Sequence, residues 1–258
     1  MKYRHSKKRA KRLLVLGLCL LLFVGVFIFR QTKFFKKPVE KSFGIKCEVV
    51  KKFDFSNDDS IKEWEEKVFK NKVSYKIEKE GGESYVKASS DKSASALYYK
   101  IKIDAKNARP VVTWKWRVDK FPAKTRAESL EIENEDDFAA RVYVIFPAMF
   151  ITNSKVLEYV WSETLPAGTV GTSPYSGNIK LMVLTQGVSK NNGWVSEERD
   201  IYSDYVKLFG KPPEYNVGAI AFMTNTEHTG TSAEAAYDDI VIGYKEEIGA
   251  NEGRGADK

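Results

Sequence analysis

Cysteine and histidine are scarce in this sequence of 258 residues, and their scarcity removes several classes of function. The chain has two cysteines and two histidines. Zinc sites use three or four protein ligands, mostly of these two kinds, and a Ser-His-Asp triad would have to use His228, because His5 lies in a basic N-terminal head. No G-x-S-x-G elbow, G-x-G-x-x-G turn or Walker loop occurs. The common serine hydrolase, dinucleotide-binding and P-loop mechanisms are therefore excluded.

Positive charge is concentrated at one end of the chain. The formal net charge is +7, but residues 1–37 contain eleven Lys and Arg and no acidic residue, which leaves −4 for the remainder. A nucleic-acid-binding domain needs a basic surface that neutralises phosphates. The mildly acidic remainder predicts that nucleic acid is not a partner.

A single long apolar run follows the basic head. It covers residues 13–29 and contains no charged residue, and as a helix it would reach about 25 Å, which is short but within the spanning range. A cleaved signal peptide is the alternative, yet no small-x-small cleavage site follows the run. A lipoprotein would use Cys19, but Leu18 before it is not small. We favour an uncleaved signal anchor with its basic end in the cytoplasm.

These features predict a single-pass protein of the cytoplasmic (inner) membrane whose main domain is extracytoplasmic, in the periplasm. Its lipid-bilayer contact is made through residues 13–29. Cys19 lies in the apolar run and Cys47 beyond it, so the two cannot pair within one chain; Cys47 is either a buried apolar residue, which we favour, or a free thiol for an intermolecular bond. The predicted segments are a cytoplasmic head (1–12), a transmembrane signal anchor (13–29), a juxtamembrane linker (30–43), the extracytoplasmic domain (44–246) and a disordered tail (247–258).

The main domain has the residue pattern of an all-β protein. About ten short runs alternate between apolar and polar residues or are continuously apolar, separated by turn residues. This pattern predicts an antiparallel β-sandwich, jelly-roll-like, with two short helices. The first helix is expected at residues 58–70, where Ser60 and Glu63 form a capping box. The second is expected at residues 199–213, where apolar positions recur at helical spacing before a glycine stop: Ile201, Tyr205, Leu208 and Gly210.

Acidic and aromatic residues are the remaining candidates for chemistry. Asp200 and Asp204 are one helical turn apart and are candidates for a cation site or an acid–base pair, but serving as partners of Arg199 is the simpler interpretation. In residues 110–119 alternation places Trp114 and Trp116 on one face, and we expect both to be buried.

The run "FAARVYVIF" has a clear apolar face, and Arg141 and Tyr143 lie on the opposite one. An arginine inside an apolar strand must find a carboxylate or reach solvent. Asp137 or Asp200 is the expected partner of Arg141. The face that carries Arg141 and Tyr143 is accordingly expected to be wet, paired, or both.

Eight motifs occur in one order that resembles a known family: "FDFS", "SASALYYKI", "WKWRV", "DDFAARVYVIF", "LEYVWS", "ERDIYSDYVKLFG", "GAIAFMTNTEHT" and "AYDDIVIGY". Over residues 48–245 the chain resembles the bacterial envelope family described as domain of unknown function three thousand and forty-seven. The resemblance implies no established activity. The family is typically richer in Asp where this chain has "MTNTEHT", and Asn225 and Glu227 stand here instead, which weakens an acid-cluster role for this loop.

We therefore predict a membrane-anchored, ligand-binding β-sandwich, most plausibly one that binds envelope polysaccharide without turning it over. Flat rings beside charged groups suit the faces and hydroxyls of sugars. The alternatives are a polysaccharide hydrolase or lyase of the same fold and a structural partner in an envelope complex. No catalytic residue is assigned; the predicted ligand-binding residues are Arg141, Tyr143, Arg117, Trp161 and Asp200.

The doublet Asp238–Asp239 precedes the last apolar run. Jelly-roll carbohydrate-binding modules resemble this arrangement, in which a C-terminal aspartate and carbonyls near the N-terminal strand hold a structural calcium, and such oxygen-only ligation suits that ion. The simpler alternative is an aspartate that caps a strand turn. No cofactor is indicated with certainty, and calcium at Asp238 or Asp239, tied to residues 53–54, is the one candidate.

Overall fold

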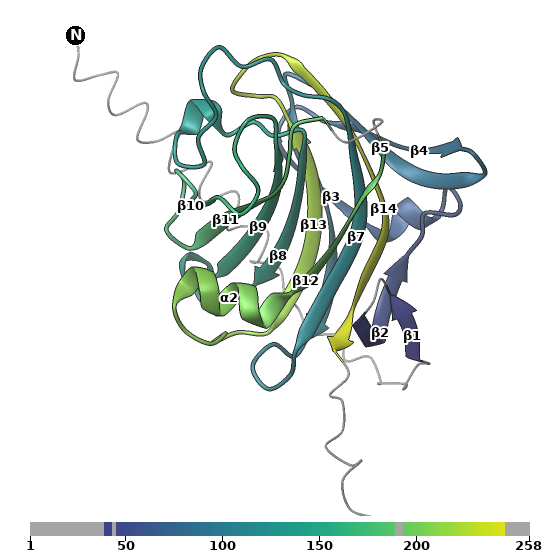
Figure 1. The fold of residues 1–258 in the computed structure, drawn as a ribbon, viewed down its shortest axis with the longest axis vertical. Coiled ribbons are helices and arrows are strands. Elements are labelled where there is room, and N and C mark those ends of the chain that lie inside the picture. Colours follow the sequence, from purple (N-terminus) through teal and green to yellow (C-terminus); the bar gives the residue numbers. More distant parts are fainter. Residues whose placement is uncertain (1–38, 43–44, 189–192, 246–258) are drawn as a thin grey trace, which may run out of the picture.

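The computed structural model describes residues 39–42, 45–188 and 193–245, which form two packed β-sheets (Figure 1). The expected anchor at 13–29, the basic head and the tail lie outside the described residues. Among the described residues, no helix has the length and apolar character needed to cross a membrane. The expected β-sandwich is confirmed for the described part of the chain.

The first sheet, sheet A, is organised around its longest strand, β14 (Ser232–Lys245). One edge of β14 pairs with β7, while its other edge pairs first with β5 and then with β2. Because three strands share β14, this strand ties both ends of the sheet together. The members of sheet A are β1 (Val39–Ser42), β2 (Ile45–Phe53), β14, β5 (Glu83–Asp91) and β4 (Ser74–Glu80), with β7 (Pro110–Lys120) and then β12 (Val195–Asp200) on the far side of β14.

The second sheet, sheet B, carries the candidate site. Its neighbouring strands are antiparallel except β9 and β11, which are parallel, so the predicted antiparallel sheet has one parallel pair. Its strands lie in the order β10 (Val170–Thr172), β11 (Ile179–Gln186), β9 (Lys155–Ser162), β8 (Ala140–Phe146), β13 (Val217–Asn225), β6 (Ala94–Ile103) and β3 (Glu65–Lys70).

The main core lies between the sheets and is rich in aromatic rings. Alternation along β7 turns Trp114 and Trp116 inward, and both are fully buried, as predicted. Their ring centroids lie 5.4 Å from Tyr159 and 5.6 Å from Trp161 of β9, respectively. These contacts join the two sheets. Cys47 of β2 is buried as well, which confirms the favoured interpretation of that residue.

The helix predicted at residues 58–70 is wrong beyond its first turn. Residues Ser60–Glu63 form one 3-10 turn, η1, after which Trp64 is extended (φ −94°, ψ 137°). The following residues form β3, the edge strand of sheet B, which pairs with β6. The apolar spacing fits a helix, but Val68 is exposed whereas Trp64 enters the main core. Backbone pairing with the open edge of β6 therefore overrides the local periodicity.

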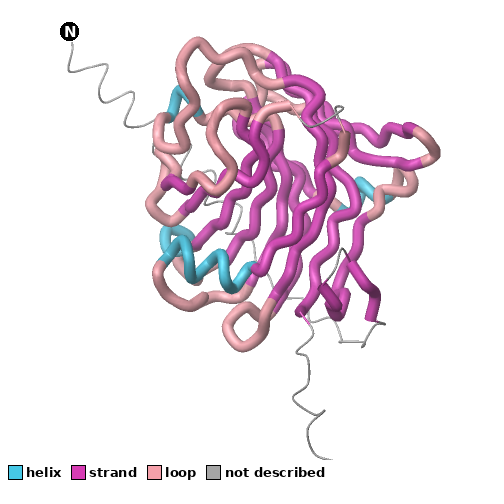
Figure 2. The backbone as a smooth tube through the Cα atoms, viewed as in Figure 1, coloured by secondary structure: helices cyan, strands magenta, loops and turns pink. Residues whose placement is uncertain are grey.

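The second predicted helix is confirmed as α2 (Ile201–Phe209), which packs against the strand ends (cyan in Figure 2). The Asp200 carboxylate accepts from the backbone N–H of Ser203 at 2.9 Å and caps the helix, and Gly210 ends it in the left-handed region (φ 72°). Asp204 forms an ion pair with Arg199 at 2.6 Å. The predicted pairing with Arg199 is therefore confirmed for Asp204.

The outer face of sheet B, which points away from the main core, carries a second apolar cluster. Tyr143, Ile145 and Met223 belong to it, and side chains from neighbouring loops, among them Leu130 and Leu165, pack against the strands. Two further short 3-10 turns in these loops are η2 (Glu133–Glu135) and η3 (Ile151–Asn153). Charged residues on this face are therefore partly shut off from water, and this sets up the site described next.

Candidate functional site

Arg141 is the centre of a buried ionic cluster on the outer face of sheet B. The alternation of β8 turns its side chain away from the main core, and it is only 3% exposed. Its Nη1 lies 2.5 Å from Oε1 of Glu158 on the neighbouring strand β9, and its Nη2 lies 3.1 Å from Oδ1 of Asp136. The guanidinium also donates to the backbone carbonyl of Asp136 and to the hydroxyl of Tyr143. One arginine thus joins two buried carboxylates.

A small pocket opens beside this cluster, and we call it the Arg141 pocket. The open space at its centre is ≈ 20 Å³, which is room for about one water molecule. A group the size of one hydroxyl therefore fits without movement of the walls. The pocket is lined by Phe69, Asp136, Arg141, Tyr143, Glu158, Ser173, Tyr175, Met223 and Glu227.

One polar atom of the cluster has no hydrogen-bond partner among the described residues: Nε of Arg141, which can only donate. Leaving such a buried donor unsatisfied costs about 1–3 kcal/mol. Oδ1 of Asp136 forms no well-aligned hydrogen bond, but it is held in the ion pair with Nη2 of Arg141 at 3.1 Å. A hydroxyl group can accept from a guanidinium N–H and donate to a carboxylate, so the two residues suit a ligand hydroxyl.

The cluster has more acid than base, and this shifts its proton equilibria. Burial raises the pKa of Glu158 to about 7, although Arg141 pulls it down and Asp136 pushes it up further. Burial also raises the pKa of Asp136, again opposed by Arg141. Because burial outweighs the charge of Arg141, Glu158 holds its proton at a pH where an exposed carboxylate would have released it.

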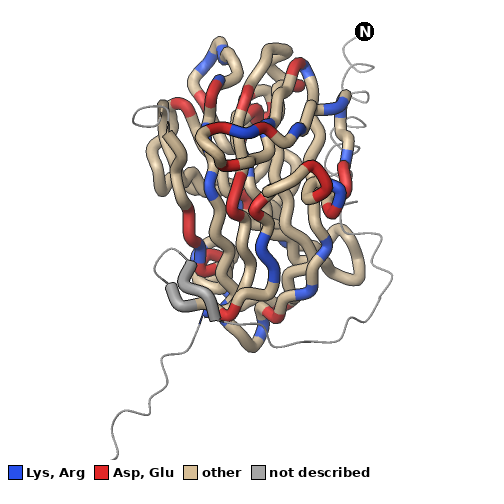
Figure 3. Tube along the Cα trace, turned by 90° about the vertical axis from the view of Figure 1, so that its right-hand side faces the viewer, with Lys and Arg blue, Asp and Glu red and all other residues tan. Residues whose placement is uncertain are grey.

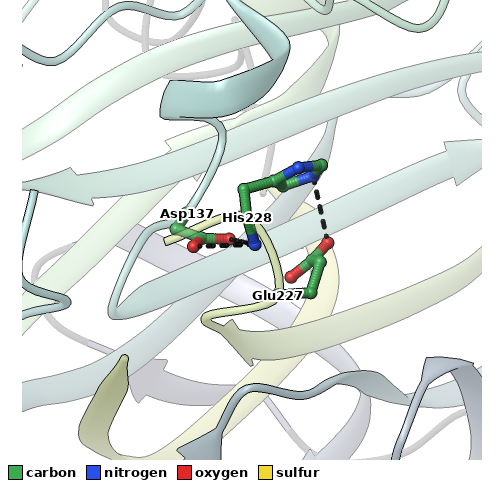
Figure 4. Close-up of side chains that lie close together, drawn as sticks. All are labelled: Asp137, Glu227 and His228. Carbon is green, nitrogen blue, oxygen red and sulfur yellow. Dashed lines mark hydrogen bonds and ion pairs between the residues drawn. The ribbon is translucent and has the colours of Figure 1, made fainter. Parts of the chain in front are cut away.

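His228, Glu227 and Tyr175 form one side of the site (Figure 4 shows the first two). The Tyr175 hydroxyl lies 2.6 Å from Nε2 of His228, and the two rings are stacked with centroids 6.1 Å apart. Nε2 of His228 also lies 3.4 Å from Oε1 of Glu227. Burial lowers the pKa of His228, but the hydrogen bond and charge of Glu227 outweigh burial and hold the pKa above its ordinary value. The acidic neighbours thus favour the charged form of His228.

Asp137, Glu227 and His228 are the three residues that could offer ligands to one metal ion within the described part of the chain. Their potential ligand atoms all lie within 4.8 Å of one another. Asp137, however, already accepts hydrogen bonds from the side chain of Asn225 (2.9 Å) and from the backbone N–H groups of His228 (3.1 Å) and Thr229 (2.7 Å). Its carboxylate therefore holds the turn after β13, as the dashed line from His228 N in Figure 4 illustrates, and we assign this cluster a structural role.

The structure brings together two of the five predicted ligand-binding residues, Arg141 and Tyr143. Trp161 lies in the main core, fully buried, with its Nε1 donating to the carbonyl of Gly187 at 2.7 Å. Asp200 caps α2. Neither Trp161 nor Asp200 lines the Arg141 pocket.

Arg117, the fifth predicted residue, lies on β7 in the other sheet. It forms ion pairs with Glu80 (2.7 Å) and Asp119 (2.8 Å), and its guanidinium carbon lies 5.3 Å and 5.1 Å from the ring centroids of Tyr85 and Trp194. Arg117 therefore belongs to a separate, more exposed group on sheet A.

Sequence reasoning missed the carboxylates that partner Arg141. It proposed Asp137 or Asp200, whereas the partners are Asp136 and Glu158. A signal for Glu158 was present, because "KVLEYVWS" holds a single acid among apolar residues in its middle, as "FAARVYVIF" holds a single base. Pairing these two isolated charges across adjacent strands would have found the contact. Tyr175, Glu227 and His228 carried no comparable pattern.

The predicted calcium residues lie on β14 near β2, since Ile240 pairs with Phe53. Asp239 adopts a left-handed backbone conformation (φ 46°) at an irregular step of the strand, and its carboxylate lies 2.6 Å from Nζ of Lys115. Burial raises the pKa of Asp238 to about 7, and its Oδ1 has no hydrogen-bond partner among the described residues. Asp239 is thus already paired, whereas Asp238 retains an acceptor.

A structural calcium at Asp238 stays a prediction. If calcium binds there, the melting temperature of the full chain in detergent should be roughly 5–10 °C higher in millimolar calcium than in the presence of a chelator. This estimate assumes a calcium concentration about 100-fold above Kd. Asp238→Asn should remove that difference, whereas Asp91→Asn, at an exposed aspartate on β5, should keep it. Identical melting curves of the parent chain with calcium and with chelator would end the idea.

Several solved structures resemble this chain at low sequence identity. The family 11 carbohydrate-binding module of the cellulase Lic26A-Cel5E of Clostridium thermocellum is 13% identical, with a TM-score of 0.41, over 81% of this chain and 100% of the module. The CBM22-1 xylan-binding domain of Paenibacillus barcinonensis Xyn10C is 8% identical, with a TM-score of 0.39, over 78% and 97%. The xyloglucanase domain of NopAA from Sinorhizobium fredii, in complex with cellobiose, is 14% identical, with a TM-score of 0.39, over 70% and 93%.

At this level of similarity none of these structures assigns a function to the chain. A search of curated proteins gave no match. The sequence profile of one family matches residues 62–241, which is well over half of the chain and includes every residue of the Arg141 pocket. The chain therefore belongs to the family described as "Protein of unknown function (DUF3047)", as its motifs indicated.

Proposed function

We propose that this protein is a membrane-anchored, extracytoplasmic β-sandwich that binds envelope polysaccharide at the Arg141 pocket. The observation that carries the proposal is the Arg141 pocket, a space of hydroxyl size lined by Arg141 and Asp136, together with Nε of Arg141, a buried donor with no hydrogen-bond partner among the described residues. A small movement of the Arg141 side chain would bring this donor to a ligand in the pocket. A sugar supplies many hydroxyl groups, each able to accept from a guanidinium N–H and to donate to a carboxylate.

The surroundings of the pocket support a sugar ring rather than an anion. Both terminal nitrogens of the one arginine that lines the pocket already face carboxyl groups, Glu158 and Asp136, so a phosphate or carboxylate ligand would have to compete with these partners for the guanidinium. Tyr175 is half-buried and stacks with His228, and a flat ring surface beside hydrogen-bonding groups suits the apolar face of a sugar. One hydroxyl would enter the pocket while the ring lies against Tyr175.

The described domain gives no support for a nucleic-acid ligand. Acidic and basic positions are intermixed on the side of the molecule drawn in Figure 3, and the chain beyond residue 37 is mildly acidic. The membrane part of the proposal rests on the uncharged apolar run at residues 13–29 and the basic residues before it. A polysaccharide of the envelope is the hydroxyl-rich ligand that such a location would offer.

A polysaccharide hydrolase or lyase is the second candidate, and one observation favours it. The pKa of Glu158 is raised to about 7, and Asp136 lies on the same guanidinium. A carboxylic acid that is protonated near neutral pH beside a second carboxylate is a common arrangement for general acid–base chemistry. The small size of the pocket favours binding over turnover, because the scissile bond would have to enter it.

The experiment is a binding survey with the full chain in detergent. Titration calorimetry with soluble neutral and uronic-acid polysaccharides should find binding to at least one of them. Tyr175→Ala should weaken that binding roughly tenfold, which corresponds to about 1.4 kcal/mol. Tyr202→Ala, which removes a ring on α2 that does not line the pocket, should leave it unchanged. Absence of binding to every polysaccharide, or equal binding by both variants, would overturn the proposed site.

The same mixtures separate the two candidates. A binding protein should release no reducing ends and form no unsaturated product during prolonged incubation. Turnover that disappears in Glu158→Gln while binding remains would instead establish the enzyme.

A further inference from the structure

The loop between β8 and β9 holds two large apolar side chains out in solvent. Met149 is 93% exposed and Phe150 is 67% exposed. The loop is nevertheless well braced: the backbone N–H of Ala148 donates to Oγ of Ser154 at 3.0 Å, and that of Asn153 donates to the carbonyl of Phe150 at 2.9 Å. A fixed turn therefore presents both side chains outward, and exposing them in this way needs a reason.

Lysine side chains lie around the base of this loop. Lys155 is the first residue of β9, and its ammonium lies 5.3 Å from the ring centroid of Phe209 of α2. Burial lowers the pKa of Lys155, and the positive charges of Lys211 and Lys180 lower it further, against the opposing effect of Glu214. Lys211 is paired with Glu214 at 2.8 Å. Lys155 and Lys180 donate to neutral oxygens, of Asn178 and Thr172 respectively, so these two ammonium groups keep a positive charge that an anionic surface would attract.

The loop lies at the end of the sandwich where the N-terminal segment arrives. The strand pairing shows this in two steps. In sheet B, the end of β8 pairs with the start of β13, and the start of β13 pairs with the end of β6, so the β8–β9 loop and the β6–β7 loop lie at the same end. In sheet A, the start of β7 pairs with the end of β14, and the end of β14 pairs with the start of β2, so β2 begins at that end too. In Figure 1, α2, β1 and β2 accordingly lie toward the same lower end.

The tether between this end and the expected anchor is short. Residues 30–38 separate the apolar run from β1, and nine residues span at most about 30 Å when fully extended. An anchor at 13–29 would therefore keep the lower end of the sandwich within reach of the bilayer surface.

We propose that Met149 and Phe150 insert into the interfacial layer of the membrane while Lys155, Lys180 and Lys211 contact anionic lipid headgroups. Two interactions hold proteins on anionic bilayers: burial of apolar side chains at the acyl boundary, and attraction between neighbouring lysines and the lipid headgroups. The contact fixes the orientation of the domain on the bilayer. This proposal rests on the anchoring part of the proposed function and is independent of the glycan site.

The test places an environment-sensitive fluorescent amino acid at position 150 of the full chain, reconstituted into vesicles that contain anionic and brominated lipids. The matched control places it at Val188, which is 68% exposed and follows the opposite end of β11. The expected result is blue-shifted emission and several-fold stronger quenching by brominated lipid at position 150 than at position 188. Lys155→Glu combined with Lys211→Glu, or vesicles of neutral lipid alone, should reduce the difference.

Flotation of the vesicles separates the ways in which the idea can fail. A chain that floats with the vesicles but is quenched equally at both positions has an anchor and no membrane-docked loop, which overturns this proposal alone. A chain that does not float overturns the anchor and the docking together. Polysaccharide binding in detergent, measured separately, depends on neither outcome.

Discussion

Replacing Arg141 by methionine is expected to destabilise the folded domain by about 3–5 kcal/mol. The substitution keeps most of the apolar volume but removes the charge that Glu158 and Asp136 both face at 2.5 and 3.1 Å. Two buried carboxylates would then lose their partner, and each would have to take up a proton or reach water. Urea denaturation of the full chain in detergent, followed by near-ultraviolet circular dichroism, measures the change.

The matched control for this change is Arg117→Met. Arg117 also bonds two carboxylates, Glu80 at 2.7 Å and Asp119 at 2.8 Å, but Glu80 is 63% exposed. Solvated pairs of this kind contribute about 0–1 kcal/mol. Adding Glu158→Gln to Arg141→Met should recover part of the lost stability, because the double variant has one fewer buried carboxylate without a partner. Equal losses for Arg141→Met and Arg117→Met would contradict the buried cluster.

The second large effect is a loss of stability as the pH rises from about 4.5 to 7. The pKa of Glu158 is about 7 in the folded domain, above its ordinary value of 4.5, so in this interval the folded state holds a proton that the unfolded chain has released. Stability then falls with increasing pH, by at most about 1.4 kcal/mol per pH unit for one proton. The raised pKa of His228 acts in the same direction, because its stabilising positive charge is lost as the pH rises through that pKa.

Glu158→Gln isolates the part that Glu158 contributes. Glutamine is neutral throughout, so the variant should be more stable than the parent chain at pH 8 and should show a flatter dependence on pH. Glu163→Gln, at an exposed position just beyond the same strand, should reproduce the parent curve. Denaturation midpoints at several pH values give the comparison. A parent chain whose stability rises between pH 4.5 and 7 would rule out a protonated Glu158.

The features that could be predicted from the sequence are those that nearby residues determine. Alternation in β7 identified Trp114 and Trp116 as core residues, because side chains on a strand point to alternate faces. The spacing of Ile201 and Tyr205 before Gly210 predicted α2, because the cap and the stop are local. The same reasoning failed at residues 65–70, where the partner that decides the structure, β6, lies about 30 residues further along the chain.

The candidate site was predictable only in part for the same reason. Arg141 was identified as a charge that needs a partner, and its own strand was sufficient for that. The partner depends on the β8–β9 register, in which Tyr143 lies opposite Glu158. The isolated charges of the two strands point to the pair, but residues 147–154 between the strands form no short hairpin turn that would fix the register. Asp136 and Asp137 are adjacent, yet one meets Arg141 and the other clamps the turn at Thr229. Only the path of the loop before β8 separates their roles.

The central claim is that a sugar hydroxyl is bound by Nε of Arg141, and nuclear magnetic resonance of the arginine side chains tests it most directly. The full chain, labelled with nitrogen-15 at arginine and held in detergent, is titrated with the best-binding polysaccharide fragment from the calorimetric survey. The account predicts that the Nε–H resonance of Arg141 shifts with the same saturation as the calorimetric signal, while those of Arg117 and Arg199 stay in place. If the protein is saturated with ligand and the Nε–H resonance of Arg141 does not shift, or that of Arg117 shifts instead, the claim is contradicted. The binding site would then lie away from the outer face of sheet B.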